Sequence, residues 1–116
     1  MRITGIYIVN VEEKTCRYKD QLNFVNTFSR GSVRELMHEF AIHAAESLDE
    51  PERKIFQHTQ FTFSCQRIGS YAIVFVTDQE YPSRVAFEIL RNLFENPSDR
   101  NMIHILETRQ DGTDAI

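Results

Sequence analysis

The six residues from Tyr71 to Val76 read Tyr-Ala-Ile-Val-Phe-Val and are apolar throughout. Successive side chains of a β-strand point to opposite faces, so a strand built from this stretch is apolar on both faces. Such a strand is stable only where another layer packs on each side of its sheet. This stretch therefore predicts a central strand in a sheet that is covered on both faces.

The residues after this strand predict a helix that lies back across the same sheet. Pro82 can begin it, because the first helical residue needs no N–H donor and the proline ring presets φ. The apolar residues behind it recur at spacings of three and four and form one helical stripe. They are Val85, Ala86, Ile89, Leu90 and Leu93.

A second amphipathic helix is predicted to begin at Ser32. Ser32 and Glu35 have the spacing of a capping box, in which each side chain accepts from the backbone N–H of the other. The apolar residues behind them repeat with the helical period, and we expect this stripe to pack on the sheet. They are Val33, Leu36, Met37, Phe40, Ala41, Ala44, Ala45 and Leu48.

Two strands are predicted before this helix. Residues 2–10 are apolar on both faces, with Ile3, Tyr7 and Val9 on one side and Ile6 and Ile8 on the other. They predict a second central strand. Residues 14–19 are half polar and rich in basic side chains, which is typical of the edge of a sheet.

Two more strands are predicted between the helices, over residues 54–58 and 61–67. In the second, Phe61, Phe63 and Cys65 alternate with polar residues, so it is expected to be buried on one face only. After the second helix, Ser98 is expected to cap a short third helix. The tail, residues 109–116, is expected to fray, which makes residues 1–108 the domain.

These elements define the expected fold class. It is α+β: a five-stranded, mostly antiparallel sheet between helical layers, with one helix on one face and two on the other, in the order β-β-α-β-β-β-α-α. The segment from Asp20 to Arg30 has no clear period but carries Leu22, Phe24, Val25 and Phe28. We expect it to be a loop folded onto the core.

Composition narrows the possible functions. The net charge of −4 comes from 17 acidic and 13 basic residues without a long basic run, so no nucleic-acid partner and no polybasic membrane patch are expected. No stretch has the roughly 20 apolar residues of a transmembrane span. Cys16 and Cys65 match no metal or redox motif and are expected to be reduced cytosolic thiols, with a disulfide as the less favoured alternative.

Catalytic motifs and metal-ligand spacings are not found. His38 and His43 are five residues apart and cannot share a helix face as a ligand pair. The four glycines form no phosphate-binding loop, and no Gly-x-Ser-x-Gly elbow is present. We therefore expect no metal, no cofactor and no enzymatic activity.

Apolar residues outside the core stripes point to a binding surface. Ile42 lies off the core face of the first helix, and Ile55 and Phe56 place apolar groups on both sides of the following strand. A groove between this helix and this strand would be apolar, and such surfaces usually meet a partner. The alternative is that the loop from Asp20 to Arg30 covers these residues.

Two motifs resemble the longin family. They are Phe28-Ser-Arg-Gly-Ser-Val-Arg-Glu-Leu-Met37 and Asp78-Gln-Glu-Tyr-Pro-Ser-Arg-Val-Ala-Phe87. Within that family the chain is most similar to the N-terminal domains of lipidated, prenylated R-SNAREs of Golgi and vacuolar membranes, over residues 1–96. The resemblance implies a profilin-like fold and a regulatory, non-catalytic role in vesicle transport and membrane fusion.

The resemblance also implies how such a domain acts. Longin domains fold back on a SNARE helix or a lipid group, and this surface would map to Leu36, Glu39, Phe40, His43, Ile55 and Phe56. Glu39 stands where the family carries an exposed aromatic residue. The SNARE helix and the terminal cysteines are not in the sequence, so the chain is either an excised domain or a free-standing longin protein.

Location and partners follow from the same resemblance. The domain would be cytoplasmic and peripheral to Golgi, endosomal or vacuolar membranes, with a SNARE helix or a trafficking adaptor as its partner. The alternative is a free-standing longin or roadblock-like adaptor that dimerises or binds a small GTPase.

Overall fold

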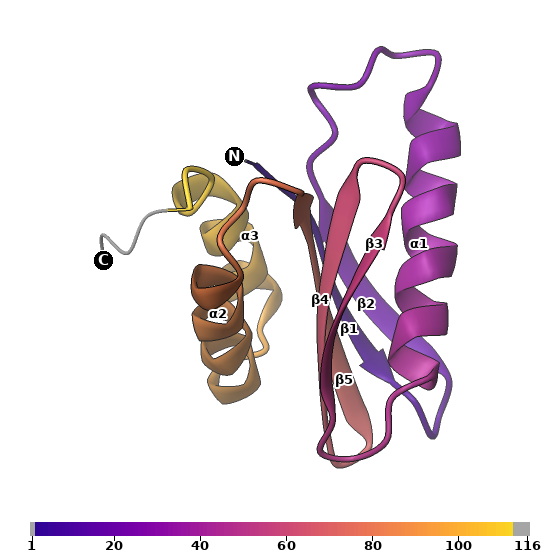
Figure 1. Ribbon diagram of the computed structural model, residues 1–116, viewed down its shortest axis with the longest axis vertical. Helices are drawn as coiled ribbons and strands as arrows, with labels where there is room; N and C mark the ends of the chain where they lie inside the picture. The colour runs from indigo at the N-terminus through magenta and orange to yellow at the C-terminus, as the bar shows by residue number, and fades with distance from the viewer. Residues whose placement is uncertain (1, 113–116) are drawn as a thin grey trace.

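The protein, in a computed structural model, forms one five-stranded sheet with helices on both faces (Figure 1), and the structure describes residues 2–112. The element order is the predicted one. The elements are β1 Ile3–Asn10, β2 Thr15–Asp20, α1 Arg30–Glu46, β3 Arg53–His58, β4 Phe61–Ile68, β5 Tyr71–Asp78, α2 Ser83–Glu95 and α3 Asp99–Thr108.

The strand order in the sheet is β2-β1-β5-β4-β3, and all four neighbouring pairs are antiparallel. The apolar strand β5 is the middle one and pairs with β1 on one side and β4 on the other. The half-polar strand β2 lies at one edge. The predictions of two central strands and of a basic edge strand are therefore confirmed.

The two helical layers pack on opposite faces of the sheet. Figure 1 shows α1 alone on one face and α2 with α3 on the other. The predicted stripe of α2 is fully buried against Ile73 and Phe75 of β5. On the other face, Met37, Ala41 and Ala45 of α1 are buried completely. The predicted arrangement of one helix against two is confirmed.

The prediction that the fourth strand is buried on one face only is wrong. Thr62 and Ser64, which alternate with the phenylalanines of β4, are also buried. Ser64 is paired with Phe75 in the register of β4 and β5, on the face that α2 covers. Small hydroxyl side chains let a helix layer come close to this part of the sheet, so the polar face of β4 is not a solvent face.

The prediction for Ile3 is also wrong. Ile3 packs in the same cluster as Ile6 and Ile8, under α2 and α3, although it is an odd number of residues away from each of them. The pairing of β1 with β5 shifts between Ile3 and Gly5. Such an irregularity inserts a residue and turns the side chains before it to the other face.

Helix α1 begins three residues earlier than a capping box with Ser32 as its N-cap predicts. Its N-cap is Ser29, and no side chain makes a cap hydrogen bond. The Val33 N–H donates to the Ser29 carbonyl at 3.0 Å, and Arg30 Nε donates to the carbonyls of Leu22 and Val25. These bonds to the preceding loop hold the first turn, so the capping-box prediction is wrong.

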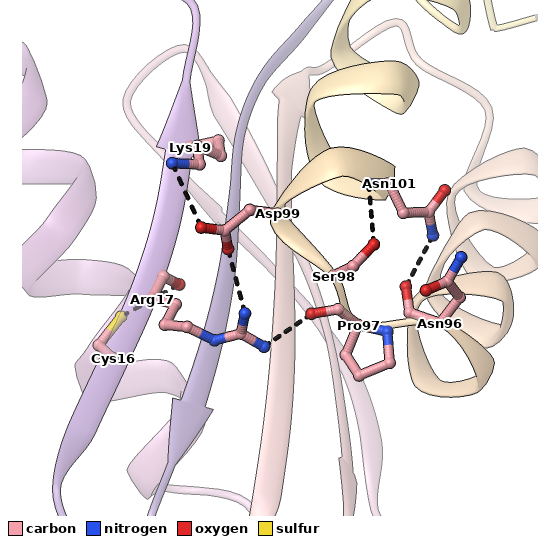
Figure 2. Close-up of polar contacts among 8 residues, drawn as sticks. All are labelled: Cys16, Arg17, Lys19, Asn96, Pro97, Ser98, Asp99 and Asn101. Carbon is pink, nitrogen blue, oxygen red and sulfur yellow. Dashed lines mark hydrogen bonds and ion pairs between the residues drawn. The ribbon is translucent and has the colours of Figure 1, made fainter.

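Helix α3 is fixed at its N-terminus to the edge strand β2 (Figure 2). Ser98 Oγ accepts from the Asn101 N–H at 3.1 Å, which confirms the predicted cap. Arg17 donates to Asp99 at 3.0 Å and to the Pro97 carbonyl at 2.6 Å. These contacts close the α3 side of β2 and leave its other face turned toward α1.

The residues after α3 contact the body of the domain. The Tyr81 hydroxyl donates to the Arg109 carbonyl at 2.6 Å, and the Ile3 N–H donates to Gln110 Oε1 at 2.7 Å. Of the tail that was expected to fray, residues 113–116 lie outside the described part of the chain.

Candidate partner-binding surface

The outer side of α1 carries a shallow hollow, which is lined by this helix and by no residue of β3, although a groove between the helix and that strand was predicted. The hollow has a volume of about 500 Å³. Four of its lining residues follow one another at helical spacing: Leu36, Glu39, Phe40 and His43. We call it the α1 hollow, and its remaining lining residues are His38, Ile42 and Glu46. Leu36 was expected in the core stripe but is 37% exposed at this surface.

Phe40 joins the α1 hollow to β3. Its ring stacks on the ring of His58 with centroids 4.5 Å apart, and it meets Phe56 edge-on at 6.4 Å. From below, Phe63 of β4 supports it at 4.6 Å. Phe40 therefore fills the space between α1 and β3, and its ring closes the α1 hollow on the side of β3.

Ile55 does not share this surface. In the register of β3 and β4, Phe56 pairs with Phe63 on the α1 face, whereas Ile55 pairs with Ser64 on the α2 face. Arg53, two residues before Ile55, lies over the Phe87 ring of α2. The structure thus brings Phe56 to the predicted group and places Ile55 on the opposite side of the sheet.

The loop before α1 does not line the α1 hollow. Leu22 is buried and Val25 packs on the α1-side core, as expected. Phe24 and Phe28 are exposed, with Phe28 99% exposed, so the prediction that all four fold onto the core is wrong for these two. Within residues 2–112, the hollow is lined by α1 alone.

A second hollow, which the sequence did not point to, lies between α1 and β2. We call it the β2 hollow; it measures about 640 Å³ and is lined by Tyr18, Gly31, Arg34, Glu35, His38 and Glu39. His38 and Glu39 also line the α1 hollow, so the two are continuous. Strand alternation could have placed Tyr18 toward a helix, but its contact with His38, at 5.1 Å between ring centroids, depends on tertiary packing.

This combined surface is acidic and partly apolar. Glu35, Glu39 and Glu46 line it, and its one arginine, Arg34, is already paired. Arg34 donates two hydrogen bonds to Asp20, at 2.6 and 3.0 Å, and this contact raises the pKa of the guanidinium. The carboxylates thus remain the charges that a partner would meet.

Beneath the β2 hollow, Tyr7 is buried and stacks on Tyr18 at 5.5 Å. Its hydroxyl has no hydrogen-bond partner among the described residues, and burial raises the pKa of the phenol. A buried, unpaired hydroxyl costs about 1–3 kcal/mol. Tyr7→Phe is therefore expected to increase the free energy of unfolding by about 1 kcal/mol in urea denaturation.

Tyr81→Phe is the matched control, because it removes a hydroxyl that donates to the Arg109 carbonyl at 2.6 Å. It is expected to lower the free energy of unfolding by about 1 kcal/mol. Equal losses in the two variants would contradict the assignment of the Tyr7 hydroxyl as unpaired.

Within residues 2–112, no group of three or more histidine, cysteine or acidic side chains is placed to hold a metal ion. Cys16 and Cys65 are free thiols. No helix in this part of the chain has the length and apolar character needed to cross a membrane.

An antiparallel sheet between helical layers defines a small α+β domain, and here it leaves a partly apolar helix surface open. Residues 22–96 match the longin family, described as a regulated-SNARE-like domain. This match spans more than half of the 116 residues, and the chain belongs to the longin family. No curated protein sequence matches it.

Proposed function

We propose that this longin domain is a non-catalytic regulator of membrane traffic that docks an amphipathic SNARE helix on α1. The observation that supports it is that the exposed Leu36 lies on the same side of α1 as Phe40, whose ring contacts Phe56 and His58. Leu36 and Phe40 are four residues apart, so they form adjacent apolar contacts on one helix side. An amphipathic partner helix presents apolar anchors at matching intervals.

The charges of the surface select the kind of helix. Glu35 and Glu46 flank the apolar contacts and favour a partner with basic residues beside its apolar stripe. A lipid chain could occupy the same apolar contacts, but carboxylates are costly to bury against hydrocarbon. A SNARE helix therefore fits the surface better than a lipid group does. The domain would act in the cytoplasm, at Golgi, endosomal or vacuolar membranes.

Titration of the labelled domain with a synthetic R-SNARE-motif peptide, followed by amide chemical shifts, tests this proposal. Shifts are expected at Leu36, Phe40 and His43 of α1 and at Phe56 of β3. Fatty acid added in a second titration is expected to cause weaker shifts. Shifts confined to α2 and α3 would overturn the proposal.

Glu39→Phe is expected to tighten binding of this peptide by about tenfold, because it replaces a carboxylate that must lose water with a large apolar contact. Isothermal titration calorimetry measures the change. Glu107→Phe makes the same substitution at an exposed site on α3 and serves as the control. Equal affinities for Glu39→Phe and the unchanged domain would show that position 39 does not contact the peptide.

A second candidate function is an adaptor that dimerises through the β3 edge. The favouring observation is that β3 ends the sheet and carries Ile55 at 44% exposure. Exposed edge strands pair readily with a second chain. Sedimentation velocity distinguishes the candidates, since a tight dimer that Ile55→Lys dissociates would favour the adaptor.

A further inference from the structure

The other face of the sheet carries a cleft that the docking role of α1 does not use. It lies between α2 and the end of the sheet formed by β3 and β4, and measures about 430 Å³. We call it the α2 cleft. The residues that matter for its chemistry are Arg53, Ile68, Arg84, Phe87, Arg91 and Phe94.

The cleft exists because the two helices on this face cover the sheet unevenly. Helix α2 packs on β4 and β5, and α3 packs on β1 and β2, so the α2-side face of β3 stays open. Phe87 and Phe94 lie beside the core stripe of α2 and pack only partly against the core. Ile68 of β4, at 45% exposure, adds a third apolar side chain. The floor of the cleft is therefore apolar and open to solvent.

Guanidinium groups surround this floor. The Arg53 guanidinium lies over the Phe87 ring, 4.4 Å from its centroid. Arg84 and Arg91 are two turns apart on α2 and line the same cleft, with Arg84 at 3.8 Å from Glu88. Glu88 is the one carboxylate in the lining. Three arginines against one glutamate make the cleft basic in a chain whose net charge is −4.

This composition contrasts with the surface of α1. There, the lining charges without an ion pair to another described residue are carboxylates, whereas the α2 cleft has an excess of cations. The two faces of the domain thus favour partners of opposite charge. Arginine suits a carboxylate partner in particular, because its planar fork donates two parallel hydrogen bonds to one carboxylate.

We propose that the α2 cleft binds an acidic peptide segment from another protein, with an apolar side chain inserted over Phe87 and carboxylates held by Arg53 and Arg91. An isolated phosphate or sulfate would use the arginines but not the apolar floor. An extended peptide uses both, and its backbone could also pair with the unpaired edge of β3.

The test uses the whole domain and a fluorescently labelled peptide in which a leucine and a phenylalanine are flanked by aspartates and glutamates. Fluorescence anisotropy measures binding, and amide shifts locate it. We expect shifts at Ile68, Phe87 and Arg91, with binding that weakens as salt rises. Two control peptides separate the contributions: one has glutamine and asparagine in place of the acids, and one has serine in place of the apolar pair.

Arg91→Glu and Arg53→Glu are each expected to weaken binding by about tenfold, since each loses a charge-assisted hydrogen bond and gains a repulsion. Arg100→Glu makes the same charge change at an exposed position of α3 outside the cleft, and is expected to change affinity less than twofold. Arg91→Gln removes the charge without placing a new carboxylate near Glu88, and Arg53→Lys is expected to retain part of the binding. Circular dichroism checks that each variant is folded.

Several outcomes would overturn this proposal. Equal losses of peptide affinity in Arg91→Glu and Arg100→Glu would mean that only the net charge of the domain matters for binding. Equal binding of the serine control peptide, or full competition by inorganic phosphate, would show a simple anion site. Stronger binding to anionic phospholipid vesicles than to the peptide would assign the cleft to a membrane surface, and undetectable peptide binding would also exclude the proposed partner.

Discussion

Leu90→Ala is expected to lower the free energy of unfolding by about 2–5 kcal/mol. Leu90 is fully buried in the stripe of α2 that packs on β5, together with Ile73 and Phe75. Truncation removes apolar contacts and leaves a cavity, because the surrounding sheet and helix relax only in part. A loss of this size is a large fraction of the 5–15 kcal/mol typical of a domain.

Urea denaturation followed by circular dichroism measures the change. Ile103→Ala is the control: it also truncates an aliphatic side chain on the same face of the sheet, but Ile103 is 43% exposed on α3. We expect the control to cost about 1 kcal/mol or less. Similar losses in the two variants would mean that the α2 stripe is not the core of this layer.

Alkaline pH is expected to destabilise the domain from about pH 9 upward, mainly through Cys65. Burial raises the pKa of this thiol from 9.0 to about 12. Between these values the unfolded chain releases the proton and the folded domain keeps it, so the free energy of unfolding falls as pH rises. At about 1.4 kcal/mol for each pH unit, the loss reaches roughly 4 kcal/mol near pH 12.

Cys65→Val tests this assignment, because valine fills a similar volume and does not ionise. Urea denaturation in reducing buffer at successive pH values should show the decline in the unchanged domain beginning near pH 9. In the variant the decline should be shallower: Cys16, whose pKa burial also raises, still contributes from about pH 9, and tyrosines such as Tyr81, whose pKa burial raises from 10.0 to about 12, add to it above about pH 10. Parallel pH profiles for the two proteins would contradict the role of Cys65.

The arrangement of the fold could be predicted because it depends on local periodicity. The spacing from Val85 to Leu93 and the two-sided apolar strand β5 specify which faces must be buried, and the structure buries them. The boundaries were less predictable. Ser32 and Glu35 have good capping chemistry, but bonds from Arg30 to the preceding loop begin α1 earlier.

The candidate site was predictable only in part. Leu36, Glu39, Phe40 and His43 lie on one side of a helix, so their spacing alone brings them together. Ile55 and Phe56 are neighbours in a strand, and strand alternation places them on opposite faces. The ring contacts of Phe40 with Phe56 and His58 join segments far apart in the chain, and periodicity carries no information about them.

What the sequence determined by itself is which side chains must leave water: alternation in the strands and the stripe of each helix specify a covered sheet, and the longin motifs specify the family. What only the tertiary structure decided is which surfaces stay open. The acidic hollows of α1 and the basic α2 cleft both depend on where helices lie across strands. The physical reason is that the spacing of apolar residues along the chain specifies which side chains must be buried. Whether a surface stays open depends instead on segments distant in the chain that do or do not cover it.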